Sequence, residues 1–240
     1  MTSTLRSLSK FFCAGLICVT LAGCAVTSTE NQATSGNATT DSSADSKTAE
    51  FINSKEQLNA TLKANFIDFS FKFPDDWEAQ EVGARPDAKN FVKVAKSLDK
   101  KDNGEFSLEN FAVGYLKTNG DAKKDAADFP KVTSLFDAEY KKGFADYKKI
   151  SEGPTKIGSL NGYELRFQST VKGSKQGDIT QWGRVVMLPK PGTKQGVTLV
   201  MMATSLSPDV KSAADLGVKG QLPVILKSFT FEKKQPEKKE

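Results

Sequence analysis

The chain has 240 residues with 34 lysines and arginines, 29 aspartates and glutamates and no histidine, which gives a formal net charge of +5. This mild balance gives no basis for nucleic-acid binding. The absence of histidine excludes Ser-His-Asp triads, Cys-His pairs and nearly every zinc or copper site. No GxxxxGK[ST] or GxGxxG motif occurs, so we expect no phosphate-cradling loop, no metal and no cofactor.

The N-terminus has the pattern of an export signal. Arg6 and Lys10 precede an apolar segment over residues 11–21. That segment is too short to cross a hydrocarbon core, which takes about 20 apolar residues. It ends in Leu21-Ala22-Gly23-Cys24, which resembles the lipobox of bacterial lipoproteins. The alternatives are an ordinary secretory signal that is cut elsewhere and a buried core helix.

The lipobox resemblance implies where the protein works. Residues 1–23 would be removed as a signal peptide, and Cys24 would receive a diacylglycerol and an acyl chain such as palmitate. Two or three chains hold a protein stably on a membrane. The domain would then lie in the periplasm or outside the cell. Ala25, rather than aspartate, after the cysteine favours the outer membrane in a cell that has one.

Cysteine usage and composition predict a tether. Cys13 and Cys18 lie in the segment that would be removed, so the mature chain keeps no free thiol for a disulfide or a nucleophile. Residues 24–50 are almost all small, polar or acidic, and such a segment buries too little apolar area to fold. As a disordered tether it would reach roughly 25 to 30 Å.

The folded part, residues 51–232, is expected to open with a short helix and a strand. Ser54 and Gln57 make a capping-box pattern that predicts the helix. Alternation over residues 66–73 predicts a strand with phenylalanines on one side. Pro74 would end this strand, and a second strand would follow Trp77, which returns to the core.

Two runs, residues 91–98 and 106–115, predict a hairpin whose turn contains Asn103-Gly104. The apolar register changes along the second run, so we expect a bulge near Glu109 or Asn110. A calcium loop over residues 99–104 is the alternative. Lys101 would occupy a position that needs an oxygen ligand, so the hairpin explains the segment better.

A charged loop over residues 117–128 and a long helix starting at Pro130 are expected next. Apolar residues recur at three- and four-residue spacing along this helix, namely Val132, Leu135, Phe136, Tyr140, Phe144 and Tyr147. Core packing against a sheet explains this spacing better than a cofactor site does.

The last third predicts a turn at Gly153-Pro154 and then three strands, near residues 163–171, 179–188 and 197–203. The third run is apolar on both sides, so it should be central and covered on both faces. Ser207-Pro208 is expected to start another helix, interrupted by glycines. Residues 233–240 form a charged tail.

The run of phenylalanines over residues 66–73 that leads into Phe73-Pro74-Asp75-Asp76-Trp77, together with the closing residues 225–231, resembles the PsbP-like superfamily. The resemblance implies an α+β fold, with an antiparallel sheet sandwiched by helices in an α/β/α arrangement. It also implies use in binding and assembly, and the family has no shared catalytic residues to carry over.

We therefore expect a non-catalytic binding domain, which is not an enzyme, acting as an accessory or assembly factor for a membrane protein complex. An unidentified envelope protein would bind through a face with Trp182, Arg184 and Arg166. The alternative is a carrier of a small ligand or lipid in a pocket between helix and sheet. A hydrolase would need a clustered Ser-Lys or Asp-Glu site. The neighbours Asp75 and Asp76 point apart and do not suit a glycosidase.

Overall fold

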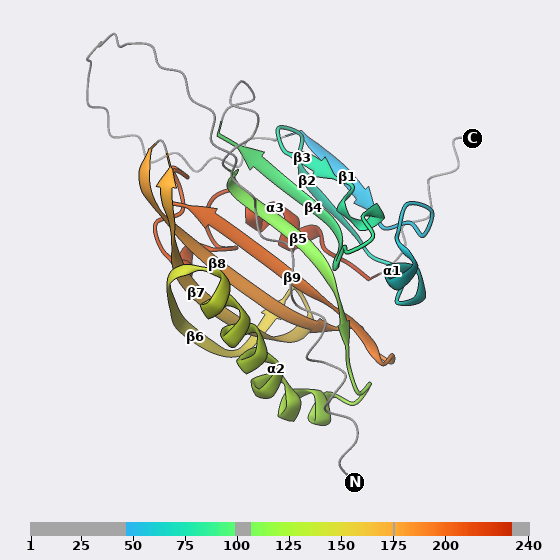
Figure 1. Cartoon of the computed structure of the whole chain (residues 1–240). Helices are drawn as coiled ribbons and strands as arrows, with labels where there is room; N and C mark the ends of the chain where they lie inside the picture. Colours follow the sequence, from blue (N-terminus) through green and yellow to red (C-terminus); the bar gives the residue numbers. More distant parts are fainter. Residues whose placement is uncertain (1–46, 99–106, 175, 232–240) are drawn as a thin grey trace.

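The computed structural model describes residues 47–98, 107–174 and 176–231. Their strands form a seven-stranded antiparallel sheet in the order β3-β4-β5-β9-β8-β7-β6 and a separate two-stranded sheet, β1-β2 (Figure 1). The small sheet consists of β1 (Thr48–Ile52) and β2 (Ser70–Pro74). The large sheet consists of β3 (Glu78–Gln80), β4 (Asn90–Ser97), β5 (Ser107–Lys117), β6 (Ala145–Ile157), β7 (Leu160–Ser174), β8 (Gly177–Pro189) and β9 (Gln195–Thr204).

Helices lie on both sides of this sheet, which confirms the expected α+β class. The α-helices are α1 (Ala60–Ala64), α2 (Ala122–Gly143) and α3 (Leu222–Ser228), and short 3-10 helices span η2 (Val82–Ala84) and η3 (Ala213–Asp215). None of the helices in the described part of the chain has the length and apolar character needed to cross a membrane. The sheet faces are called face one, which packs on α3 and the small sheet, and face two, which packs on α2.

Strand β9 is the fourth of the seven strands and contributes to the packing on both faces, as its sequence predicts. Val197 and Leu199 belong to the core of face one, whereas Val200 and Met202 pack against the core of face two. An apolar run without polar alternation therefore marks a strand that is covered on both sides.

The phenylalanine side of β2 is buried in face one, which confirms the alternation. Phe71 packs edge-on against Phe111 of β5, with 5.1 Å between ring centroids, and Phe69 stacks on Phe229 at 5.8 Å. The small sheet moves the predicted boundary between the tether and the folded domain, because β1 pairs with β2, with Phe51 opposite Phe71. Residues 48–50, which composition assigned to the tether, belong to β1, since β2 supplies hydrogen-bond partners that composition does not reveal.

Helix α2 starts earlier than predicted. The Asp121 carboxylate accepts hydrogen bonds from the backbone N–H groups of Lys123 and Lys124 and caps the helix. Residues 122–128 are therefore helical, and Pro130 lies inside the helix rather than at its start. The proline removes one backbone donor, but a capped N-terminus and a buried face keep the helix continuous through it.

The face of α2 also differs in detail from the expected one. Phe129 and Phe136 are buried, whereas Leu135 is 52% exposed. Tyr147 lies beyond the helix on β6 and still packs in the core of face two, where its ring centroid is 5.4 Å from that of Phe167. The predicted helical run from Val132 to Tyr147 therefore contributes to the core of face two from two elements, α2 and β6.

Three further local predictions are wrong. Asn59, not Ser54, caps α1 through a hydrogen bond from the Leu62 N–H. Gly153-Pro154 lies within β6, an edge strand where the missing proline N–H costs no sheet bond. Ser207-Pro208 starts no helix, because Ser207 is buried and hydrogen-bonded to the sheet.

The bulge in β5 is confirmed. Lys96 pairs with Glu109 and Ser97 with Ser107, which leaves Leu108 as the extra residue. The turn at Asn103-Gly104 and the rejected calcium loop lie outside the described residues. The signal peptide, Cys24, most of the tether and the charged tail also lie outside them.

Candidate functional site

The most polar part of the interior lies under a segment that we call the strap, residues 205–221, which connects β9 to α3. It contains little regular structure beyond η3, yet Val210, Ala213 and Leu216 are buried in the core of face one. Buried carbonyl groups in such a segment need donors from elsewhere, because no helix or ladder supplies them.

Two arginines supply these donors. Arg166 of β7 and Arg184 of β8 are directly paired in register. Arg166 Nη1 donates to the carbonyl oxygens of Ala213 and Ala214, the latter at 3.3 Å. Arg184 Nη1 donates to the Leu216 carbonyl oxygen, also at 3.3 Å. The two strands thereby hold the middle of the strap.

Glu164 joins the two arginines. Its Oε1 accepts from Arg166 Nε at 2.7 Å, and its Oε2 accepts from Arg184 Nε at 2.8 Å. Burial pushes the pKa of Glu164 upward, but the hydrogen bonds and charges of both arginines outweigh burial and hold that pKa below its ordinary value. Burial lowers the pKa of Arg184, and the neighbouring Glu164 charge opposes this shift. Glu164 is therefore ionised at neutral pH and offsets one of the two positive charges.

The predicted binding residues occur in this region. Arg166 and Arg184 lie together, and Trp182 comes two positions earlier on β8, in register with Gln168. However, Trp182 is only 7% exposed and Arg184 only 5%, and the strap carbonyls already accept hydrogen bonds from both arginines. The three side chains share a face that the strap covers, so in this conformation they do not form an accessible surface. Their role in binding stays a prediction.

A second buried carboxylate, Glu109 at the β5 bulge, holds the ends of the strap. Glu109 is 3% exposed, and its Oε1 accepts from the Ser207 hydroxyl at 3.1 Å. Its Oε2 accepts from the Gln221 backbone N–H at 3.3 Å. Gly220 has φ +70° here, and a Cβ at that position would lie 2.6 Å from Glu109 Oε1. Burial raises the pKa of Glu109, while these hydrogen bonds oppose the rise.

Sequence reasoning located the bulge but not the role of Glu109. The available signal was a single carboxylate at the point where the apolar register of the strand changes, between Leu108 and Phe111. Glu164 was missed for a different reason, because its partners come together only when the strap folds over β7 and β8.

The same cluster contains a serine and a lysine, Ser207 and Lys211, which are the residue types that a histidine-free hydrolase would need. Ser207 is fully buried, and its hydroxyl donates to Glu109. Lys211 Nζ donates to the Ser207 carbonyl oxygen at 3.0 Å rather than to its hydroxyl. The Lys211 amine is therefore not placed to take the proton from the Ser207 hydroxyl. The burial of Ser207 also leaves no open approach for a substrate.

Carboxylates elsewhere give no stronger site. Asp76 pairs with Lys96 at 3.0 Å at the exposed turn before β3. Within the described ranges, no group of three or more acidic, histidine or cysteine side chains is arranged to hold a metal ion.

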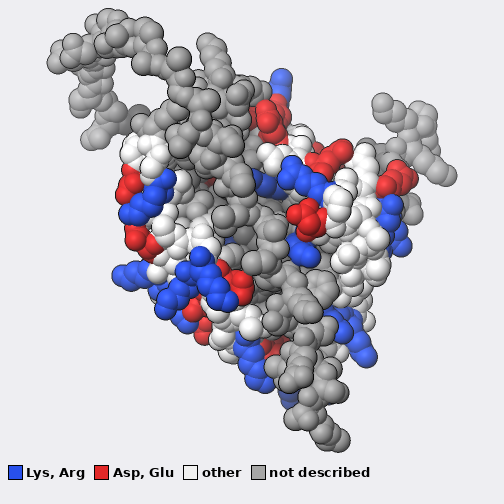
Figure 2. Space-filling model, in the orientation of Figure 1, with Lys and Arg blue, Asp and Glu red and all other residues white. Residues whose placement is uncertain are grey.

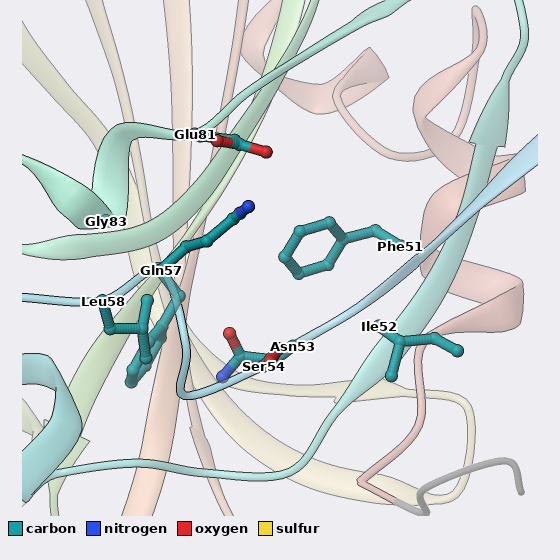
Figure 3. Close-up of a pocket in the computed structure, with 9 residues that line it drawn as sticks. Phe51, Ile52, Asn53, Ser54, Gln57, Leu58, Glu81 and Gly83 are labelled. Atoms are coloured by element: carbon teal, nitrogen blue, oxygen red, sulfur yellow. The ribbon is translucent and has the colours of Figure 1, made fainter.

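A small pocket opens where β1 ends (Figure 3). Phe51, Gln57 and Glu81 surround it, and its volume is about 50 Å³. Small-molecule sites usually measure about 300–1,000 Å³. Asn53, which also lines the pocket, donates from Nδ2 to the Ile67 carbonyl oxygen at 2.8 Å. In this conformation the pocket is too small for a metabolite or a lipid chain.

Comparison with known proteins gives distant likenesses. No protein-family model and no curated protein matches the chain. The fold is similar to cyanobacterial PsbP (CyanoP) from Synechocystis sp. PCC 6803, with a TM-score of 0.42, 12% identity and coverage of 69% of this chain and 85% of that one.

Two further solved structures have comparable scores. LpqN of Mycobacterium tuberculosis, described as involved in cell envelope biogenesis, has a TM-score of 0.42 and 13% identity over 76% of this chain and 90% of that one. The Ran-binding protein Mog1p of Saccharomyces cerevisiae has a TM-score of 0.41 and 11% identity over 77% of this chain and 95% of that one. At this level of similarity, the three likenesses assign neither a family nor a function to this chain.

Proposed function

We propose that the protein is a lipid-anchored accessory or assembly factor at a bacterial envelope membrane, with a non-catalytic binding domain. The observation that carries this proposal is Leu21-Ala22-Gly23-Cys24 directly after a short apolar segment. Cys24 is the lipidated residue in this proposal, and Ala25 favours the outer membrane. The described domain then stands beside the bilayer on the segment that precedes β1.

Binding is supported over catalysis by how the polar interior is used. Glu109, Glu164 and the two arginines are all engaged with the strap or with each other. The chain has no histidine to act as a general base. The alternative, carriage of a small ligand or lipid, receives no support from the pocket at the end of β1, because its volume is only about 50 Å³.

A PsbP-like domain is part of the proposal, on the strength of the two sequence motifs. These motifs, far apart in the sequence, lie side by side in the fold. Ser70, at the start of β2, bridges to Thr230 after α3, and Ser228 donates from its hydroxyl to the Lys72 carbonyl oxygen at 3.2 Å. The opening and closing motifs therefore form one structural unit.

Fractionation of two matched variants tests the anchor. Cys24→Ser should block lipidation and processing, whereas Cys18→Ser, in the segment that would be removed, should behave as the unchanged chain. We expect the unchanged chain and Cys18→Ser to be shortened and to enter the membrane fraction. A shortened, membrane-bound Cys24→Ser protein would contradict the proposed anchor.

The accessory role needs a separate experiment. Deleting the gene should lower the amount of one membrane complex on native gels, and the unchanged chain should restore that complex while Cys24→Ser should not. Unchanged levels of all membrane complexes after deletion would contradict an assembly role and leave the anchor intact.

A further inference from the structure

The pocket at the end of β1, which we call the β1 pocket, contains a buried oxygen atom without a hydrogen-bond partner. Asn53 is 2% exposed, and its Nδ2 donates to the Ile67 carbonyl oxygen at 2.8 Å. This bond fixes the orientation of the amide, so Oδ1 lies on the other side, towards the pocket (Figure 3). Within the described part of the chain, Oδ1 accepts no hydrogen bond. Such buried acceptors are rare in native proteins, and this one indicates a donor that enters from outside the chain.

The β1 pocket also has an unpaired negative charge. Glu81 lines it, is exposed and forms no ion pair with the described residues. Lys55, the lysine closest to Asn53 in the sequence, lies over the Phe66 ring instead, with 5.0 Å from Nζ to the ring centroid. Figure 2 shows acidic and basic side chains interspersed over the described surface in that view, so selection of a cation there needs a local site. A positively charged donor gains from both Asn53 and Glu81.

The size and the apolar lining of the β1 pocket restrict this donor further. Phe51, Leu58 and Phe91 line the pocket, together with Ile52, which is 40% exposed. A volume of about 50 Å³ admits the end of a side chain but not a metabolite. A lysine lays its methylene stem along apolar surface and ends in a compact ammonium group. The arginine guanidinium is larger and brings five donors to a single buried acceptor.

We propose that the β1 pocket takes the ammonium group of a lysine side chain from the protein partner. The ammonium group donates to Asn53 Oδ1, and the Glu81 carboxylate offsets its charge. The proposed accessory function supplies this partner, so the inference rests on that function. It adds the place of contact and the chemistry of the residue that the partner inserts.

Small probes test the chemistry of the pocket. The full-length product, purified from membranes in detergent, is titrated with butylammonium, 1-butanol or tetramethylammonium, while NMR follows the amide signals of Asn53 and Gly83. Butylammonium has both a charge and N–H donors, whereas 1-butanol lacks the charge and tetramethylammonium lacks the donors. We expect butylammonium to bind saturably and several-fold more tightly than either of the other probes.

Matched variants assign the two contacts. Glu81→Gln should weaken the binding of butylammonium several-fold and leave that of 1-butanol unchanged. Glu78→Gln is the control, because Glu78 is exposed and does not line the pocket. Asn53→Leu should abolish the preference for butylammonium over tetramethylammonium. Asn53 also holds the Ile67 carbonyl, so melting temperatures are compared first, and Glu81→Gln decides the matter if Asn53→Leu unfolds.

Carbodiimide coupling in native membranes identifies the source of the amine. The reagent activates a carboxylate, a neighbouring amine displaces it to form an amide bond, and the carbodiimide leaves as a urea that has taken up the water. Peptide mass spectrometry should find Glu81 joined to a lysine of another protein, several-fold more often than Glu78.

The remaining results would overturn the proposal in different ways. Equal affinity for the three probes, or no saturable shift, would assign Asn53 Oδ1 to solvent. Binding of butylammonium without a link between Glu81 and a partner lysine would assign the pocket to a free small amine. Full rescue of the membrane complex by Glu81→Gln in the deletion strain would place the partner elsewhere and leave the accessory function standing. Unchanged complexes after gene deletion would contradict that function itself, and the partner contact with it.

Discussion

The two faces of the large sheet are covered in different ways. Face one is covered by the small sheet, α3 and the irregular strap, and it contains the buried Glu109 and the partly buried Glu164. Face two is covered by the single long helix α2, and its core is rich in rings packed around Phe167, including Tyr140 at 4.9 Å and Phe144 at 5.6 Å between centroids.

The difference follows from backbone hydrogen bonding. A helix satisfies its own backbone except at the ends, so α2 needs only a cap and an apolar side. The strap has no such internal pairing, and its buried carbonyl and N–H groups take partners from Arg166, Arg184 and Glu109. The charged groups beneath the strap therefore hold irregular backbone in place.

Breaking the Glu164 cluster should have the largest effect. Glu164→Gln removes the negative charge between the buried Arg184 and the partly buried Arg166, and we expect it to lower the free energy of unfolding by about 3–5 kcal/mol. Glu152→Gln, on the adjacent β6, is the control, because its 3.5 Å pair with Lys149 is partly exposed and should contribute only about 0–1 kcal/mol. Urea unfolding of both variants checks the contrast, and equal losses would contradict the role assigned to Glu164.

Crowding the ring cluster of face two should have the next largest effect. Gly183 pairs with Phe167 across β7 and β8, and a Cβ at Gly183 would collide with the Phe167 ring. Gly183→Ala should therefore cost about 1–3 kcal/mol.

The control for this change is Gly153→Ala. A Cβ at Gly153 meets nothing within 4 Å on the edge strand, so the change should stay within about 0.5 kcal/mol. Thermal unfolding measures both, and a Gly183→Ala protein as stable as Gly153→Ala would show that the ring cluster tolerates displacement.

Removing the cap of α2 should have a smaller effect. Asp121→Ala leaves the Lys123 and Lys124 N–H groups without their acceptor, which should cost about 0.5–2 kcal/mol. Asp121→Asn keeps a capping side chain and should lose much less. If Asp121→Ala unfolds at the same urea concentration as the unchanged protein, the early start of α2 is not fixed by this cap.

Replacing Glu109 should change how the free energy of unfolding depends on pH. Burial raises the pKa of Glu109 in the folded state, so this group binds a proton more tightly when folded. Its contribution favours folding below the unfolded pKa and is lost as pH rises through the folded pKa. Glu109→Gln should remove this loss. Urea unfolding of both proteins between mildly acidic and neutral pH gives the free energy of unfolding as a function of pH. The two curves should converge at the acidic end, where Glu109 is protonated, and parallel curves would contradict the raised pKa.

Several elements follow from local pattern alone. Alternation fixes the buried side of β2, the unbroken apolar run places β9 at the centre, and the change of register in β5 locates the bulge beside Glu109. These signals work because side-chain period and burial depend on adjacent residues.

Other features depend on partners that are distant in the sequence. Pro130 within α2 and Pro154 within β6 look like boundaries until the cap and the sheet edge are known. Trp182 and Arg184 look like a surface until the strap covers them. The strap itself has no periodicity to predict, because the sheet supplies its hydrogen-bond partners.

The intact mass of the mature protein, purified from bacterial membranes, tests the central claim most directly. The account predicts a chain that begins at Cys24 and has the added mass of a diacylglyceryl group and an amide-linked acyl chain. A chain that retains residues 1–23, or an unmodified N-terminus beyond position 24, would contradict it.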